Sequence, residues 1–458
     1  MNDSGEPRQR LHPLTPLLRG IRTFTVLVAA ISLQGFAQLG VERGAVVVLL
    51  AVLGTLVLSW VSWYFTGYQV VNRELRVYEG LLWRRTRAIA LERLQSVELV
   101  QPLLARLFGL AELRLEVVGA AKTEAPLAFL TLAQANQLRD HLLSISAGAH
   151  RTAAPAPVGT DAYLPGPVPG PGYVAGPQPQ PAPPPPERVL HQVLPQHLLI
   201  AQLLTPEALF VPFAVAGSMV NFAFNPDLSL IGIVTVAMAA VGIALRPIRR
   251  VIAEYGFTVS ATPNGLRLRQ GLTETRSQTV PPGRVQAVAV TWPLLWRPLG
   301  WLRARIDVAG YTGGSNERTA GGTLLPVADP VVAQQVIAQV LPGVDIARVP
   351  LTRVPPQARF RAPLAYLVLA AGLGEDVFAV RFGLLTRHLV LVPYARIQSV
   401  RIVQGPWQRR LGLASVHADT AGLRVAAVAL HRDLAEARWL VAELTERARR
   451  ARHADVAR

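Results

Sequence analysis

A five-residue motif that occurs three times limits what this chain can fold into more than any other feature. Its copies are Arg93–Val97, Arg284–Val288 and Arg396–Val400. Each motif glutamine lies in the same register with a glycine fifteen residues before it, an arginine eleven after, a glycine fourteen after and an acid twenty-one after. These recurring positions are Gly80, Gly271 and Gly383; Arg106, Arg297 and Arg409; Gly109, Gly300 and Gly412; and Glu116, Asp307 and Asp419. A gapless register of this length predicts three copies of one small domain.

The spacing and patterning of the copies predict their extent and class. The motif glutamines lie 191 and 112 residues apart, which excludes a stacked solenoid and indicates an insertion between the first two copies. In the first copy Leu113, Leu115 and Val117 alternate with polar residues, as in a half-buried strand. Thr131 then begins a closing helix. We expect domains at residues 67–148, 251–346 and 358–450, with a linker at 347–357.

Long apolar runs predict a membrane protein. A basic segment at residues 1–22 precedes two runs within residues 23–66, and two more lie within residues 189–250 after a short interfacial segment. Each run approaches the roughly 20 residues that cross a bilayer, so we expect two transmembrane hairpins. Arginines flank these runs on the side of the domains, which places both termini and all three domains in the cytoplasm of a four-span protein of the inner membrane.

Residues 149–188 have a different composition, dominated by proline, glycine and alanine. Such a segment buries too little apolar surface to fold, and its prolines lack the N–H donors that a sheet needs. It predicts a disordered, semi-rigid tether between the first and second domains.

Composition and motifs exclude several classes of function. The chain has no cysteine, and its nine histidines show no metal-ligand spacing, so we expect neither a metal site nor a cofactor. No nucleophile elbow, phosphate loop or dinucleotide motif is present, which predicts that the protein is not an enzyme. The net charge of +17 comes almost entirely from arginines that are spread along the chain, without any nucleic-acid motif. This pattern favours anionic lipid over nucleic acid as the partner.

The motifs and their order resemble the YdbT-like family of bacterial membrane proteins. The resemblance depends on the three motif copies, each followed by Leu107–Leu110, Leu299–Trp301 or Leu411–Leu413. Arg10–Pro13 is also similar to the start of that family. The repeated unit is the bacterial pleckstrin-homology-like domain, also called the membrane-flanked domain. The resemblance implies an α+β membrane protein with two helical hairpins and three PH-like domains, each a bent antiparallel sheet closed by a helix.

The expected function is that of a non-catalytic membrane scaffold. Its domains would bind lipid with anionic head groups or a membrane-protein partner. The resemblance also implies a role in envelope stress or defence. An accessory or gating subunit of a transport system is the alternative. The candidate binding residues lie on a recurring rim, where arginine would meet lipid phosphate beside apolar side chains or, equally, lie outside a closed core. They are Arg106, Arg297, Arg409, Trp296, Trp301 and Trp407.

Overall fold

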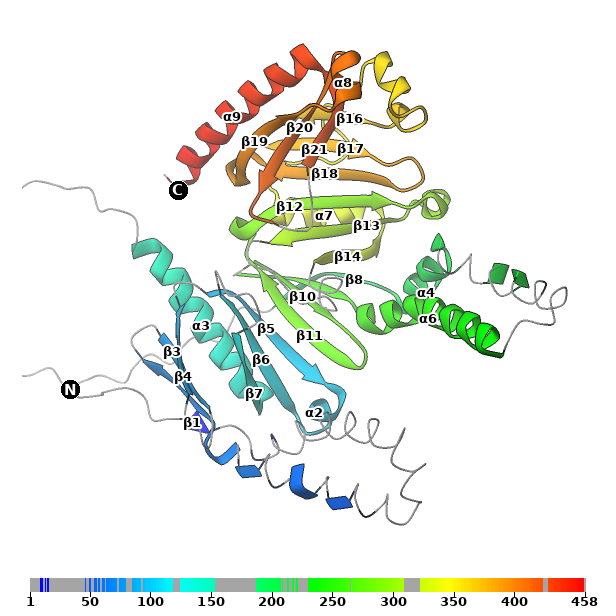
Figure 1. Ribbon diagram of the computed structural model, residues 1–458. Coiled ribbons are helices and arrows are strands. Elements are labelled where there is room, and N and C mark those ends of the chain that lie inside the picture. Colours follow the sequence, from blue (N-terminus) through cyan, green and yellow to red (C-terminus); the bar gives the residue numbers. More distant parts are fainter. Residues whose placement is uncertain are drawn as a thin grey trace, which may run out of the picture.

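The computed structural model contains four antiparallel sheets in a row, flanked by long helices (Figure 1). Apart from isolated positions before residue 63 and between 206 and 230, the structure describes residues 63–71, 74–79, 85–91, 94–117, 124–152, 187–206, 230–263, 265–308, 322–422 and 427–456. The predicted tether at 149–188 lies mostly outside these ranges, as do residues 23–45 of the first predicted hairpin.

The two central sheets each combine strands of successive repeats. In the described chain the sheet orders are β1-β2-β3-β4, β7-β6-β5-β11-β10-β9-β8, β14-β13-β12-β18-β17-β16-β15 and β19-β20-β21. The strands are β1 (Gln9–Arg10), β2 (Gly67–Val71), β3 (Glu74–Glu79), β4 (Arg85–Ala90), β5 (Leu94–Pro102), β6 (Leu110–Val117), β7 (Glu124–Thr131), β8 (Arg188–Gln192), β9 (Thr258–Thr262), β10 (Gly265–Gln270), β11 (Glu274–Val280), β12 (Val285–Trp292), β13 (Leu302–Val308), β14 (Thr323–Ala328), β15 (Thr352–Arg353), β16 (Ala370–Leu373), β17 (Val377–Phe382), β18 (Arg387–Pro393), β19 (Ile397–Val403), β20 (Leu413–Thr420) and β21 (Ala427–Asp433).

The hydrophobic core also crosses the repeats. Ala287 and Ala289 of β12 are buried in one cluster with Phe378, Val390 and Tyr394 of the third repeat. Burial of such apolar surface contributes about 25 cal/mol per Å², so the second and third repeats stabilise each other. The third repeat is therefore not an independent body, although its sequence reads as one.

A helix follows the last strand of each repeat, and Figure 1 shows two of them lying along their sheets. These are α3 (Leu132–Thr152), α7 (Pro330–Val340) and α9 (Leu434–Val456). Thr131 caps α3, because its backbone N–H donates to Gln134 Oε1 at 3.3 Å and its Oγ1 accepts from the Gln134 N–H at 3.4 Å. Ala135 and Leu142 of α3 are buried against the first core, whereas Leu138 is partly buried.

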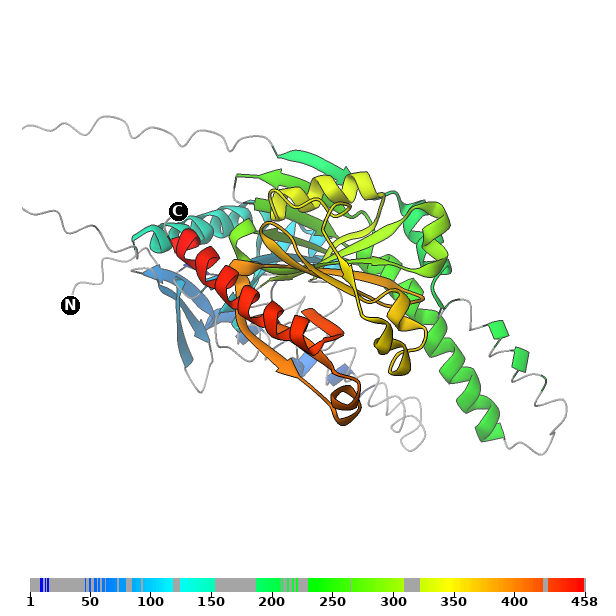
Figure 2. The same cartoon turned by 90° about the horizontal axis from the view of Figure 1, so that it is seen from above.

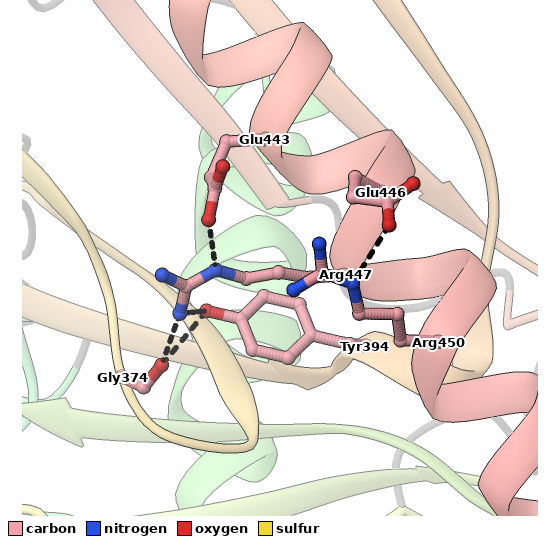
Figure 3. Close-up of polar contacts among 6 residues, drawn as sticks. All are labelled: Gly374, Tyr394, Glu443, Glu446, Arg447 and Arg450. Atoms are coloured by element: carbon pink, nitrogen blue, oxygen red, sulfur yellow. Dashed lines mark hydrogen bonds and ion pairs between the residues drawn. The ribbon is translucent and has the colours of Figure 1, made fainter.

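Arg447 fastens α9 to the turn between β16 and β17 (Figure 3). Its Nη1 donates to the Gly374 carbonyl at 3.0 Å and to the Tyr394 hydroxyl at 3.3 Å, and its Nε donates to Glu443 at 2.7 Å. The Tyr394 hydroxyl donates to the same carbonyl at 2.9 Å. Burial raises the pKa of Tyr394, whereas the nearby Arg447 opposes that rise. The phenol therefore stays a neutral donor.

The recurring glycines that the structure describes stand where the backbone is left-handed. Gly271 and Gly383 have φ of +109° and +87°, and a Cβ there would lie 2.0 Å from the carbonyl oxygen three residues later. Gly109, Gly300 and Gly412 have φ of +65°, +70° and +65°. Each lies between the short helical segment that follows the motif strand and the next strand, which is β6, β13 or β20. Only glycine adopts these angles without strain, which explains why both positions recur in the repeat.

The prediction of two transmembrane hairpins is overturned by the helices. Within the described ranges, no helix has both the length and the apolar character that crossing a bilayer requires. The longest helix of the second predicted hairpin is α6 (Leu230–Glu254), and Arg246, Arg249, Arg250 and Glu254 occupy its last third. Its apolar part, Leu230 to Leu245, is shorter than the roughly 20 residues a span needs. The structure therefore does not support a four-span location in the inner membrane with cytoplasmic termini.

Two helices beside the second repeat form an arm on the row of sheets. These are α4 (Pro195–Leu203) and α6, and Figures 1 and 2 both show α6 projecting away from the sheets. Trp296 of the second repeat joins this arm to the core, because its Nε1 donates to the Ala201 carbonyl at 3.0 Å.

Candidate functional site

A short helical segment follows the motif strand of each repeat and carries the recurring arginine. These three tip segments are α2 (Leu103–Leu107), η3 (Leu294–Leu299) and α8 (Pro406–Arg410). Figure 1 places α2 and α8 at opposite ends of the row of sheets. The candidate residues of the three repeats therefore do not form one continuous rim.

The tips of the first and third repeats are exposed and mix apolar with basic side chains. In α2, Arg106 is exposed, and so are Leu107 at 74% and Phe108, just after the helix, at 55%. In α8, Arg409 is exposed and Trp407 is 66% exposed. Large apolar side chains this exposed are typical of interaction surfaces.

The tip of the second repeat is different, because its tryptophans face the protein. Trp296 is only 2% exposed and belongs to the core around α4. Trp301 packs against the same core, with its ring 5.0 Å from the ring of His197. Neither tryptophan offers the exposed face that Trp407 offers.

Arg297, in the same segment, reaches across to the third repeat. Its Nη2 donates to the carbonyl oxygens of Leu384 and Leu385, at 2.9 and 2.8 Å, in the turn between β17 and β18. Its Nε is buried without a hydrogen-bond partner among the described residues. Burial, and then the charge of Arg387, lower the pKa of Arg297. The guanidinium thus retains an unused donor beside another cation.

A cleft of about 700 Å³ opens at this contact between the second and third repeats. Four arginines line it, and they are Arg297, Arg353, Arg381 and Arg387. No aspartate or glutamate is among its described lining residues, and none of the four forms an ion pair with a described carboxylate. Trp292, Leu351, Leu367 and Leu389 supply apolar walls. We name this site the arginine cleft.

No described carboxylate lines the arginine cleft to offset the repulsion between its cations. Burial, and then the charges of Arg353 and Arg387, lower the pKa of Arg381. Its Nε donates to the Val368 carbonyl at 3.3 Å, which holds the guanidinium on β17. An anion in the cleft would relieve the repulsion, and arginine matches the oxygens of phosphate and carboxylate in a bidentate fork.

Two exposed apolar side chains lie at or beside the arginine cleft. Leu385, whose carbonyl holds Arg297, is 65% exposed, and Leu367 is 52% exposed in η5 (Ala365–Leu367). The cleft thus combines a cationic interior with an apolar margin.

Sequence reasoning identified one of these four arginines and missed the other three. Arg297 stands at a recurring position, whereas Arg353, Arg381 and Arg387 belong to no shared motif. They meet Arg297 only because β18 pairs with β12, with Arg387 opposite Trp292. Aligning the repeats could have placed these three arginines beside Arg297 only if it were known which strand of one repeat pairs with which strand of the next.

Comparison with known proteins agrees with this repeated architecture. Residues 24–145, 210–344 and 324–448 match the family described as "Bacterial PH domain". The chain belongs to the bacterial PH domain family. The resemblance seen in the sequence motifs is therefore confirmed.

One curated relative gives a more distant match. It is the "UPF0699 transmembrane protein YdbT" of Bacillus subtilis (strain 168), 26% identical over 143 residues. These residues make up 30% of this chain and 29% of the relative, so the chain matches less than a third of that protein. No solved structure matches the chain.

Proposed function

We propose that this protein is a non-catalytic scaffold that binds anionic lipid head groups in its arginine cleft. Domains of its family are in general non-catalytic and commonly bind lipids or proteins. The observation that carries the proposal is the set of four arginines that line one cleft without a described carboxylate. Membrane lipid is the proposed source of the anion because the exposed Leu367 lines the cleft and the exposed Leu385 lies beside it, where acyl chains would lie.

Each residue of the arginine cleft has a defined role in this proposal. Arg353 and Arg387 are exposed and meet the head group first, while the half-buried Arg381 and Arg297 hold the phosphate oxygens. Leu367 and Leu385 enter the outer part of the leaflet. The exposed tips α2 and α8 add further apolar and basic contacts at the membrane surface. Each arginine near an anionic surface contributes about 1 kcal/mol.

Vesicle flotation of the full chain tests the proposal. The protein should float with vesicles of phosphatidylcholine and phosphatidylglycerol, should stay behind with phosphatidylcholine alone, and should be released as salt rises. The double variant Arg353→Gln, Arg387→Gln should bind roughly 30-fold more weakly, from about 2 kcal/mol of lost attraction. Both side chains are exposed, so the fold should survive.

A matched pair of arginines elsewhere provides the control. Arg359→Gln with Arg438→Gln removes the same charge from exposed positions that do not line the arginine cleft. This control should bind nearly as tightly as the unmodified chain. Equal weakening by both pairs would mean diffuse attraction by net charge, and an absence of binding to anionic vesicles at low salt would overturn lipid binding. Competition by glycerol 3-phosphate at low concentration would show that the cleft takes a soluble phosphate instead.

A further inference from the structure

The motif strands of the first two repeats are each paired by a strand of the following repeat. β5 pairs antiparallel with β11, and β12 pairs antiparallel with β18. The register is the same at both junctions. Arg276 lies opposite Val100 and His388 lies opposite Thr291, and each of these residues is five positions after the recurring glycine or motif glutamine of its own repeat. One interface is thus built twice within the chain.

The third motif strand, β19, has no such partner. Among the described residues it pairs only with β20, so its other edge is open. At the opposite end of the chain β4 is the first-repeat equivalent of β11 and β18, and it pairs only with β3 in the described part of the molecule. Among the described residues, β4 and β19 are therefore the two unpaired counterparts of the interface that the chain builds twice internally.

Several side chains of β19 are more exposed than the equivalent side chains of β5 and β12. Leu99 and Val290, four positions after their motif glutamines, are 4% and 0% exposed. The equivalent Ile402 is 38% exposed. The next position shows the same contrast between the first and third repeats, with Val100 at 0% and Val403 at 41%, whereas Thr291 of the second repeat is partly exposed. The third repeat thus leaves exposed an apolar residue, Ile402, at a position that is buried in both other repeats.

We propose that β4 of a second copy of this chain pairs with β19 and covers this edge. A strand of the same chain does not fit, because Figure 1 shows β4 and β19 at opposite ends of the molecule. The internal junctions fix the register, with Arg85 opposite Val403, Thr86 opposite Ile402 and Ala88 opposite Val400. Exposed strand edges template this kind of addition.

The proposed pairing is head-to-tail, so it generates a ring or an extended assembly. Arg87 would stand opposite Arg401, and like charges across a strand pair oppose association. Asp419 offsets part of this repulsion, because the Arg401 Nε donates to it at 2.9 Å. We therefore expect a reversible assembly that tightens as salt screens the remaining repulsion. This proposal does not depend on lipid binding.

The absence of native cysteine allows a direct test by disulfide trapping. Thr86→Cys and Ile402→Cys are made as separate single variants of the full chain, mixed, and oxidised with copper phenanthroline in air. Residues directly opposite in an antiparallel pair have Cβ atoms about 4.5–5.5 Å apart, near what a disulfide accepts, whereas diagonal neighbours lie about 7–8 Å apart. A cross-linked dimer should form in the mixture, and the protein carrying both cysteines should form a ladder of larger species.

The controls distinguish other arrangements. Thr86→Cys mixed with Val400→Cys is out of register by two residues and should cross-link at least fivefold less. If Ile402→Cys alone cross-links as well as the mixture does, two β19 strands pair with each other and the proposal is wrong. Light scattering on the unmodified chain gives an independent readout. A monomer across the accessible concentration range, together with no cross-link in the mixture, would overturn the proposal, and both variants replace exposed side chains, so they should fold.

Discussion

Arg276 on β11 lies directly opposite Val100 on β5, although the two residues belong to different repeats and are 176 positions apart in the chain. This pairing makes the first two repeats share one sheet, and the equivalent pairing of β12 with β18 joins the second to the third. The arginine cleft lies at the second of these junctions. The repeats are thus a continuous scaffold with its candidate ligand site between two of them.

The recurring glycine before the motif predicts a position-specific loss of stability. Gly383→Ala should lower the free energy of unfolding by about 1–3 kcal/mol, because its φ of +87° is left-handed and the new Cβ would lie 2.0 Å from the Thr386 carbonyl. Gly283→Ala is the control, since a Cβ there meets nothing within 4 Å. Urea unfolding followed by circular dichroism measures both. Equal effects would contradict the structural reason given for the recurrence.

The fastening of α9 predicts a difference between two neighbouring arginines. Arg447→Met should lower the free energy of unfolding by roughly 1–3 kcal/mol, because it removes hydrogen bonds to Gly374, Tyr394 and Glu443. Arg449→Met removes an exposed pair with Glu446 and should change it by less than about 0.5 kcal/mol. Thermal unfolding of the two variants side by side tests this. If Arg449→Met proves as damaging, the contacts in Figure 3 do not anchor the helix.

Histidine burial predicts that the third repeat loses stability in mild acid. His431 Nδ1 lies 2.9 Å from Nε2 of Gln408, whose amide donates to it, and burial followed by the charge of Arg361 lowers the pKa of His431. The unfolded chain, with a histidine pKa of about 6.5, then binds more protons than the folded one. Stability is therefore fully present above about pH 6.5 and falls as the pH drops below it.

Urea unfolding at pH 7.5 and pH 5.5 measures this pH dependence. His431→Gln should reduce it, because the titrating group is gone. His453→Gln, at an exposed position near the end of α9, should leave it unchanged. A pH dependence that is the same in His431→Gln and in the unmodified chain would rule out His431 as its source.

The tryptophans of the tip segments should behave differently from one another. Trp296→Ala should lower the free energy of unfolding by about 3–5 kcal/mol, because it empties a core site and leaves the Ala201 carbonyl unbonded. Trp407→Ala should have little effect on stability, because that side chain is 66% exposed. It should instead weaken flotation with anionic vesicles. Loss of stability in Trp407→Ala without loss of flotation would assign α8 a structural role.

The repeats, their class and their closing helices could be predicted from sequence because each leaves a local signature. Alternation at Leu113 and Leu115 predicted a strand, and Thr131 predicted a helix start; the structure has both. Arg106, Arg409 and Trp407 are exposed, although α2 and α8 lie too far apart to form one rim. Trp296 lies one repeat position after the equivalent of Trp407, and the residues equivalent to Trp296 in the other repeats, Ala105 and Gln408, are buried as well.

The features that sequence did not predict depend on long-range pairing. Nothing near Arg387 reveals that its strand lies beside β12, so three arginines of the cleft could not be assigned. The transmembrane hairpins were wrong for a related reason. The arginines after Leu245 belong to the same helix as the apolar run before them. The apolar part of α6 is therefore too short for a span.

Photochemical cross-linking at the opening of the arginine cleft tests lipid binding most directly. A photoreactive amino acid replaces Leu367, which is 52% exposed and lines the cleft, and a second protein carries it at Trp439, which is 56% exposed on α9. After irradiation with mixed vesicles, mass spectrometry should find phospholipid adducts at position 367, enriched in phosphatidylglycerol, and few at position 439. Equal labelling of the two positions, or no lipid adduct at position 367, would contradict the proposed function.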